Sequence, residues 1–220
     1  MPPLSTDLHL RMYEKGKKSR KLVTRLKSAF KMVFSSENIY GLEWGDPETV
    51  PPLGYVRDHF LKPNLSPDTT VLEIGPGGGR WTRYMLGVKK IYAVDYHSEL
   101  LNELKRNLGS RNIEFVKNNG NDFPGIPDGS IDFLFSFGTF VHLDLDIIEQ
   151  YLKNMLRILK PSGVAVLQYS DKNKPMAKAN VGFSENTPEI MRQIVLKNGF
   201  TILEEDTMTL WHSSIIRFSR

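Results

Sequence analysis

Short apolar runs alternate with amphipathic stretches from residue 69 onward. Runs of this length, bounded by turn-forming residues, predict buried strands at residues 71–74, 91–94, 113–116, 131–137 and 164–169. Apolar residues at helical spacing predict helices at residues 80–86, 98–108, 147–159 and 188–197. Strands separated by helices indicate a parallel sheet that is covered on both faces, which is the doubly wound α/β class.

The last two predicted strands, residues 200–204 and about 210–218, have no helix between them. They should therefore pair antiparallel, as a tight connection requires. Together with the five earlier strands they predict a seven-stranded sheet that is mostly parallel, with an antiparallel last strand.

The N-terminal part has a different character. Residues 20–34 place apolar side chains at helical spacing with Lys and Arg between them, which predicts a basic amphipathic helix. Three roles remain open: docking on the body, contact with a membrane surface through residues 11–34, or binding of an anionic partner. The turn-rich loop that follows leads to a helix at about residues 53–61, so we predict a helical cap at residues 1–52 and a main domain at residues 53–220.

Composition narrows the class of protein. A chain of 220 residues, 40% hydrophobic and 25% charged, suits one globular α/β domain with a cap. Since the chain has no cysteine, disulfides, thiolate metal sites and cysteine nucleophiles are excluded. It also lacks an apolar stretch of about 20 residues and a secretory signal, so we expect a cytoplasmic protein.

The net charge of +4 is unevenly distributed. Residues 1–31 hold nine Lys or Arg against Asp7 and Glu14, a charge of +7, so the rest of the chain sums to −3. The basic character therefore belongs to the cap, and the main domain is slightly acidic.

A glycine-rich turn follows the first predicted strand. Glu73 lies in the strand end, and Gly75, Gly77 and Gly79 follow at alternate positions. Glycines let a ligand lie against bare backbone, and Asp95 at the end of the next strand can accept hydrogen bonds from ribose hydroxyls. This arrangement predicts a nucleoside-containing cofactor, although turn capping is the alternative role for Glu73 and Asp95. Arg80, where a dinucleotide fingerprint has its third glycine, disfavours a nicotinamide enzyme.

The pattern Glu-x-Gly-x-Gly-x-Gly, from Glu73 to Gly79, resembles motif I of the class I S-adenosylmethionine (SAM)-dependent methyltransferases. The resemblance extends over residues 69–218 and implies a Rossmann-like methyltransferase fold with SAM as cofactor. It implies that the glycines line the methionine part and that Asp95 holds the ribose. It further places Tyr96, Asp122, Phe123 and Ser136 beside the cofactor, with Asp122 at the adenine amino group or, alternatively, only in a turn.

His142 is the candidate general base. It follows the fourth strand, at the carboxyl edge where ligands of such folds bind, and an ordinary imidazole pKa near 6.5 suits a base at neutral pH. A capping or packing role is the alternative. Tyr169, Asp171 and His212 come from segments that converge on the same edge and are candidates for substrate binding. Asp171 could also cap a turn, or hold a divalent cation such as Mg²⁺ together with His142.

No Asn-Pro-Pro-Tyr motif follows the fourth strand, and no close glutamate pair resembles the protein arginine methyltransferases. A histidine at this place favours O-methylation, and three short stretches resemble sugar O-methyltransferases that act on mannosides: residues 140–144, 169–172 and 182–188. We therefore predict methyl transfer from SAM to a hydroxyl of a small or carbohydrate acceptor, with nucleic acid not expected as a partner. A lipid or quinone-precursor methyltransferase at a membrane surface, and a non-catalytic SAM-binding or RNA-associated protein, are the alternatives. Metal dependence and oligomeric state are left open.

Overall fold

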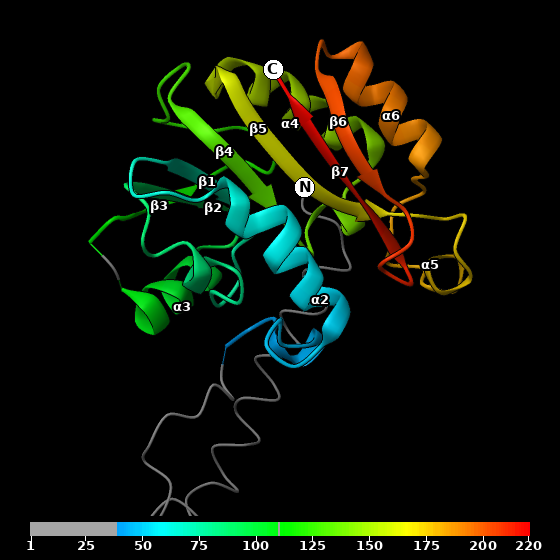
Figure 1. Ribbon diagram of the computed structural model, residues 1–220, viewed down its shortest axis with the longest axis horizontal. Helices are drawn as coiled ribbons and strands as arrows, with labels where there is room; N and C mark the ends of the chain where they lie inside the picture. The colour runs from blue at the N-terminus through cyan, green and yellow to red at the C-terminus, as the bar shows by residue number, and fades with distance from the viewer. Residues whose placement is uncertain (1–38, 110) are drawn as a thin grey trace, which may run out of the picture.

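The computed structural model describes residues 39–109 and 111–220, and a seven-stranded sheet forms the centre of this part (Figure 1). Its strands are β1 (Thr70–Ile74), β2 (Lys90–Asp95), β3 (Ile113–Lys117), β4 (Ile131–Ser136), β5 (Leu159–Ser170), β6 (Thr201–Asp206) and β7 (Ser213–Ser219). The spatial order is β3-β2-β1-β4-β5-β7-β6. The first five strands pair in parallel, and β7 runs antiparallel to both β5 and β6, which confirms the predicted fold class.

Helices cover both faces of the sheet. The longer ones are α3 (Ser98–Leu108), α4 (Leu145–Ile158) and α6 (Pro188–Lys197), as the apolar spacing predicts. The shorter ones are η1 (Leu42–Trp44), α2 (Pro51–Tyr55), η2 (Val56–Leu61), η3 (Lys62–Asn64), η4 (Thr82–Tyr84), η5 (Phe140–His142) and α5 (Pro175–Ala179). In Figure 1, α2 lies in front of the sheet and α4 lies behind it.

Side chains that alternate along the strands pack into two separate hydrophobic cores. In β1, Leu72 packs in one buried cluster with Leu152 of α4, whereas its neighbour Val71 packs in the other with Phe60 of η2. All four side chains are fully buried. Successive side chains of a strand point to opposite faces, so a strand buried on both sides must be apolar throughout, as β1 and β4 nearly are.

Three predicted elements differ from the structure. The helix expected at residues 80–86 is a single 3₁₀ turn, Thr82–Tyr84, of the kind that commonly serves as a short connector. The helix expected at residues 53–61 begins at Pro51, since proline is favoured in the first helical turn, and it continues through a π-helical segment. The fifth strand begins five residues early, at Leu159, where it pairs with Ile131 across an irregularity in the register.

The predicted basic helix at residues 20–34, and the membrane-contact segment at residues 11–34, lie outside the described residues. The chain from residue 39 onward packs across the glycine turn: Gly78 N donates to the Tyr40 carbonyl (3.0 Å), and Tyr40 N donates to Glu103 Oε1 (3.0 Å). Residues 39–52, assigned to the cap from the sequence, therefore contact the main domain directly.

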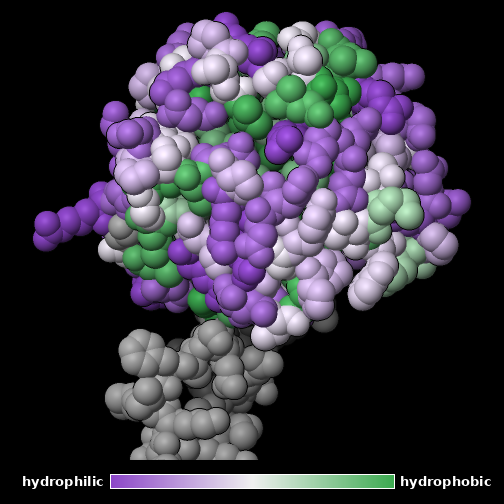
Figure 2. Space-filling model, in the orientation of Figure 1, coloured by the Kyte–Doolittle hydropathy of each residue, from purple (hydrophilic) through white to green (hydrophobic). Residues whose placement is uncertain are grey.

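The surface in view is mostly hydrophilic (Figure 2). Hydrophobic residues gather mainly near the top of that view, where α6 and β6 lie in Figure 1. Leu196 of α6 and Leu203 of β6 are exposed hydrophobic residues of these two elements. Among the described residues, no helix combines the length and apolar composition that crossing a bilayer requires.

Candidate functional site

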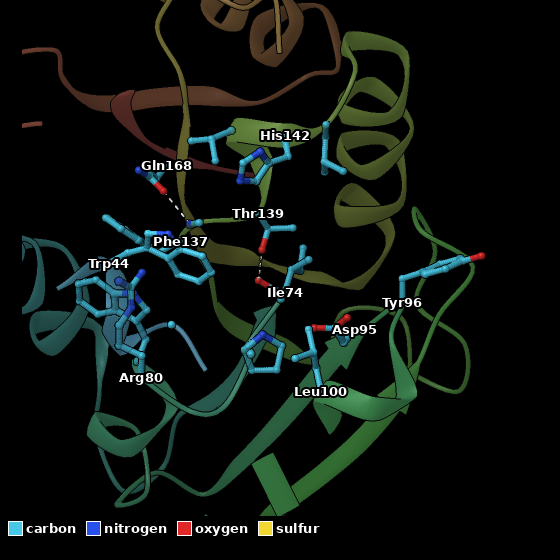
Figure 3. A pocket seen from close by; sticks show the side chains of 18 of the residues that line it. Trp44, Ile74, Arg80, Asp95, Tyr96, Leu100, Phe137, Thr139, His142 and Gln168 are labelled. Atoms are coloured by element: carbon cyan, nitrogen blue, oxygen red, sulfur yellow. Dashed lines mark hydrogen bonds between the residues drawn. The ribbon is translucent and has the colours of Figure 1, made fainter. Parts of the chain in front are cut away.

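A cavity of about 440 Å³ opens at the carboxyl edge of the sheet. The ends of β1, β2, β4 and β5 contribute to its wall, together with residues just before β7 and the segment around residues 40–44. Ligands of doubly wound folds bind at this edge, and the cavity has the size of an ordinary ligand pocket. Figure 3 shows Asp95 and Tyr96 on one side of it, Arg80 and Trp44 on the other, and His142 beyond Thr139.

The glycine turn after β1 forms the floor. Gly75 and Gly77 line the cavity with φ of 68° and 57°, a backbone region that residues other than glycine rarely adopt. A Cβ on Gly75 would lie 1.8 Å from Thr139 Oγ1, so glycine is required here by close packing. Gly79 faces Leu104 and Leu108 of α3 and does not line the cavity.

Glu73 lies beneath the turn. Its side chain is buried, and Thr82 Oγ1 donates a hydrogen bond to its Oε2 at 2.5 Å. Burial raises the pKa of Glu73 to about 7. Glu73 does not line the cavity. Its side chain instead bonds Thr82 and so ties η4 to the end of β1.

Asp95, at the end of β2, faces the cavity while almost fully buried. Its Oδ1 accepts a hydrogen bond from His97 N at 2.8 Å, and burial raises its pKa to about 7. A ligand that donates hydrogen bonds to the carboxylate would favour its charged form. Tyr96, Leu100 and Tyr151 complete this end of the cavity with ring and aliphatic surface, which suits a planar base beside a ribose.

Two residues predicted for the adenine end do not line the cavity. Asp122 closes its own turn, since Asn119 N donates to its Oδ1 at 2.8 Å, and Phe123 is buried against Tyr151 with ring centroids 5.7 Å apart. Asn118 organises this loop: its amide nitrogen donates to Tyr151 Oη (2.8 Å) and to the Asp122 carbonyl (3.1 Å). Asn118 directly follows β3, and the sequence pattern did not single it out as the residue that orders this loop.

The opposite end holds two histidines. His142 ends η5 and lines the cavity, with its Nδ1 2.8 Å from the carbonyl oxygen of Gly182. His212 also lines the cavity, and burial, followed by the charge of Lys174, lowers its pKa. The ring of Phe183 lies between them, 5.3 Å from the His142 centroid and 5.2 Å from that of His212.

The remaining predicted residues are buried away from the cavity. Ser136 Oγ donates to the Ile74 carbonyl (2.9 Å) and ties β4 to β1, while Tyr169 is fully enclosed in the core. Asp171 accepts a hydrogen bond from Ser214 Oγ (2.7 Å) and so holds its loop against β7. Over residues 39–109 and 111–220, no three His, Cys, Asp or Glu side chains cluster closely enough to hold a metal ion.

The structure adds wall residues that the sequence did not single out as site residues. They come from the N-terminal segment, the glycine turn and three later loops, and include Tyr40, Trp44, Leu53, Arg80, Thr139, Gln168, Asn180, Phe183 and Leu210. Arg80 was noted only as a departure from a dinucleotide fingerprint. No spacing rule connects these positions, because contacts between distant segments bring them together.

Comparisons with known proteins agree with this geometry. Residues 72–167 match the family model described as a methyltransferase domain. A SAM-dependent methyltransferase from Mesorhizobium loti has a similar structure, with a TM-score of 0.64 at 12% identity over 79% of this chain and 100% of that one. The CcbJ methyltransferase from Streptomyces caelestis gives a TM-score of 0.63 at 15% identity over 80% of this chain and 99% of that one.

A SAM-dependent methyltransferase from Aquifex aeolicus gives a TM-score of 0.56 at 21% identity, over 79% of this chain and 97% of that one. At such identities the likeness shows the fold. The cavity fits SAM independently, since it joins open glycine backbone at Gly75 and Gly77 to a buried carboxylate at Asp95. Residues 72–167 thus match a methyltransferase domain, the fold is shared with SAM-dependent methyltransferases, and the cavity has the features that SAM as cofactor requires.

Proposed function

We propose that the protein transfers the methyl group of SAM to a hydroxyl of a small or carbohydrate acceptor, with His142 as general base. The observation that carries this proposal is the place of His142 in the same cavity as Asp95 and the glycine turn. SAM, when bound, supplies a methyl group that is already activated on a positively charged sulfur. The protein then has to align the acceptor, which can contribute about 7–11 kcal/mol, and to remove its proton.

The contact of His142 with Gly182 supports the role of base. A carbonyl oxygen accepts hydrogen bonds only, so the 2.8 Å contact requires the proton on Nδ1. In a neutral imidazole the lone pair is then on Nε2, which can take the proton of an acceptor hydroxyl. The backbone at Gly182 thereby orients the ring and selects its tautomer.

The wall near His142 supports a hydroxyl acceptor of modest size. Aromatic rings of Phe183 and Phe137 offer flat surfaces, and the side chains of Gln168 and Asn180 also line the cavity. Ring faces together with a few placed polar groups are what a small hydroxylated ligand needs for orientation. The resemblance of residues 140–144, 169–172 and 182–188 to sugar O-methyltransferases is the support for a carbohydrate in particular.

The test compares His142→Ala with His212→Ala, because both histidines line the same end of the cavity. Acceptor mixtures of alcohols, sugars and amines are first screened for release of S-adenosylhomocysteine, with and without Mg²⁺. We expect turnover with a hydroxyl acceptor to fall about 10²–10⁴-fold in His142→Ala, while SAM affinity by calorimetry stays within about threefold. The acidic limb of the pH–rate profile should disappear in His142→Ala and persist in His212→Ala. Unchanged turnover in His142→Ala would remove the base assignment, and turnover with amines alone would remove O-methylation.

A further inference from the structure

Arg80 is a buried cation in the cavity wall. Arg80 is only 6% exposed, lines the cavity and directly follows Gly79 of the glycine turn. The guanidinium lies 5.4 Å from the ring centroid of Phe137 and 5.6 Å from that of Trp81, and its Nη1 donates a long hydrogen bond (3.3 Å) to the Gly45 carbonyl. Rings and one carbonyl therefore form most of its surroundings.

No described carboxylate forms an ion pair with Arg80. Among the described residues none lies within the 4.0 Å of an ion pair, and the attraction comes from further away, from Glu43 and Glu73 foremost. Burial lowers the pKa of Arg80 to about 10, so the side chain is still charged at neutral pH. Its neighbour Arg83, by contrast, pairs directly with Asp46. A charge kept in a buried site without a counter-ion is costly, which points to an anion supplied by a ligand.

The position of Arg80 indicates which ligand group this is. Figure 3 shows Arg80 across the cavity from Asp95, with Ile74 at the end of β1 between them. Asp95 is the candidate for the ribose, and Gly75 and Gly77 form the floor between the two sides. A ligand with its nucleoside at Asp95 and an anionic group at its other end would fill this length. SAM has that layout, since its amino-acid part ends in a carboxylate.

We propose that the Arg80 guanidinium binds the carboxylate of the methionine part of SAM and thereby sets the direction in which the cofactor lies. The guanidinium forms a planar fork that matches a carboxylate with two parallel hydrogen bonds. The cofactor then runs from Tyr96 and Asp95 to Arg80. The inference rests on SAM as cofactor and does not depend on the acceptor or on His142.

A second role follows for the N-terminal segment. Arg80 contacts the Gly45 carbonyl, and a Cβ on Gly41 would lie 3.6 Å from the Arg80 side chain. The same guanidinium therefore contacts the segment at residues 41–45 and, by the proposal, the cofactor. A cofactor carboxylate held at Arg80 lies against this segment, which forms that wall of the cavity.

The test is a cycle of two ligands and two proteins, measured by calorimetry without any acceptor. SAM and decarboxylated SAM differ only in the carboxylate, so the ratio of their dissociation constants isolates its contribution. We expect the native protein to bind SAM between about 10-fold and about 100-fold more tightly than decarboxylated SAM. In Arg80→Gln the ratio should fall to within about twofold of one, with the affinity for decarboxylated SAM nearly unchanged.

Arg83→Gln is the matched control, because Arg83 is close in sequence but does not line the cavity, and its ratio should stay at the native value. Arg80→Lys keeps the charge without the fork and should give an intermediate ratio. Because each ratio is taken within one protein, partial loss of folded protein in a variant affects both ligands alike. A native ratio near one, or a ratio that is unchanged in both Arg80 variants, would overturn the proposal. Loss of turnover in a separate acceptor assay would leave the ratio untouched, so the two proposals fail independently.

Discussion

Replacing Asp95 by Asn should make the protein without cofactor more stable and the complex with SAM weaker. The Asp95 carboxyl is almost fully buried, and burial raises its pKa from 3.8 to about 7. Asn has the same shape and can still accept the hydrogen bond from His97 N, which now goes to Oδ1 at 2.8 Å. The substitution therefore removes the buried negative charge with little change of packing.

The sign of the effect follows from proton binding. The folded protein holds the Asp95 proton more tightly than the unfolded chain, so the free energy of unfolding falls as the pH rises from about 4 to about 7 and is then level. The difference between 3.8 and about 7 corresponds to about 4 kcal/mol, at 1.36 kcal/mol per pH unit, as an upper bound. Asp95→Asn lacks this loss, so its advantage should grow from near zero at pH 4 to as much as about 4 kcal/mol at pH 8.

Urea unfolding without SAM at pH 4 to 8 measures this advantage, with Asp122→Asn as the control outside the cavity. Adding SAM should reduce this advantage, because the ribose hydroxyls can donate to the Asp95 carboxylate but lose a charged acceptor in the variant. The SAM-dependent rise in melting temperature should therefore shrink in Asp95→Asn. An advantage that does not change with pH, or a variant that is less stable than the native protein at pH 8, would refute the reasoning about the buried carboxylate.

Two further substitutions test the walls of the cavity. Gly75→Ala should cost about 3 kcal/mol or more in urea unfolding, because its Cβ would lie 1.8 Å from Thr139 Oγ1 at a φ of 68°. Gly129→Ala, at a φ of 57° but with open space around it, should cost only about 1–2 kcal/mol, and equal costs would contradict the packing argument. Lys174→Met should cost about 1–3 kcal/mol, because Lys174 Nζ donates to the Leu210 and Ser213 carbonyls at 2.7 Å each; unchanged stability would show that these bonds contribute little.

Much of the fold could be predicted from the sequence, because the signals that define it are local. Apolar runs and helical spacing identified all seven strands and the helices α3, α4 and α6, with shifts mainly at the ends. The antiparallel pairing of β6 and β7 followed from the lack of a helix between them. The place of Gly75, Gly77 and Asp95 at the edge where the cavity opens could also be predicted, since a turn after one buried strand and an acid after the next occupy the same sheet edge.

The direction of individual side chains was decided by tertiary contacts. Glu73 and Asp171 carry carboxylates at strand ends, as Asp95 does, yet Glu73 bonds Thr82 and Asp171 bonds Ser214 inside the protein. A strand end places a residue near the site, but alternation and the neighbouring loops decide whether its side chain faces the cavity or the core. The sequence therefore identified the edge and only part of the wall.

The other wall of the cavity depends on contacts between segments far apart in the chain. Tyr40 and Trp44 reach the site because backbone groups near residue 40 bond Gly78 and Glu103, and no local pattern encodes such a pairing. Arg80 became a candidate cofactor-binding residue only once the structure showed it buried in the cavity wall, with no carboxylate of residues 39–109 or 111–220 in ion-pair contact. Hydrophobic period and turn residues are properties of neighbouring positions and can be predicted from the sequence, whereas the counter-ion of a buried charge depends on long-range packing that only the folded chain determines.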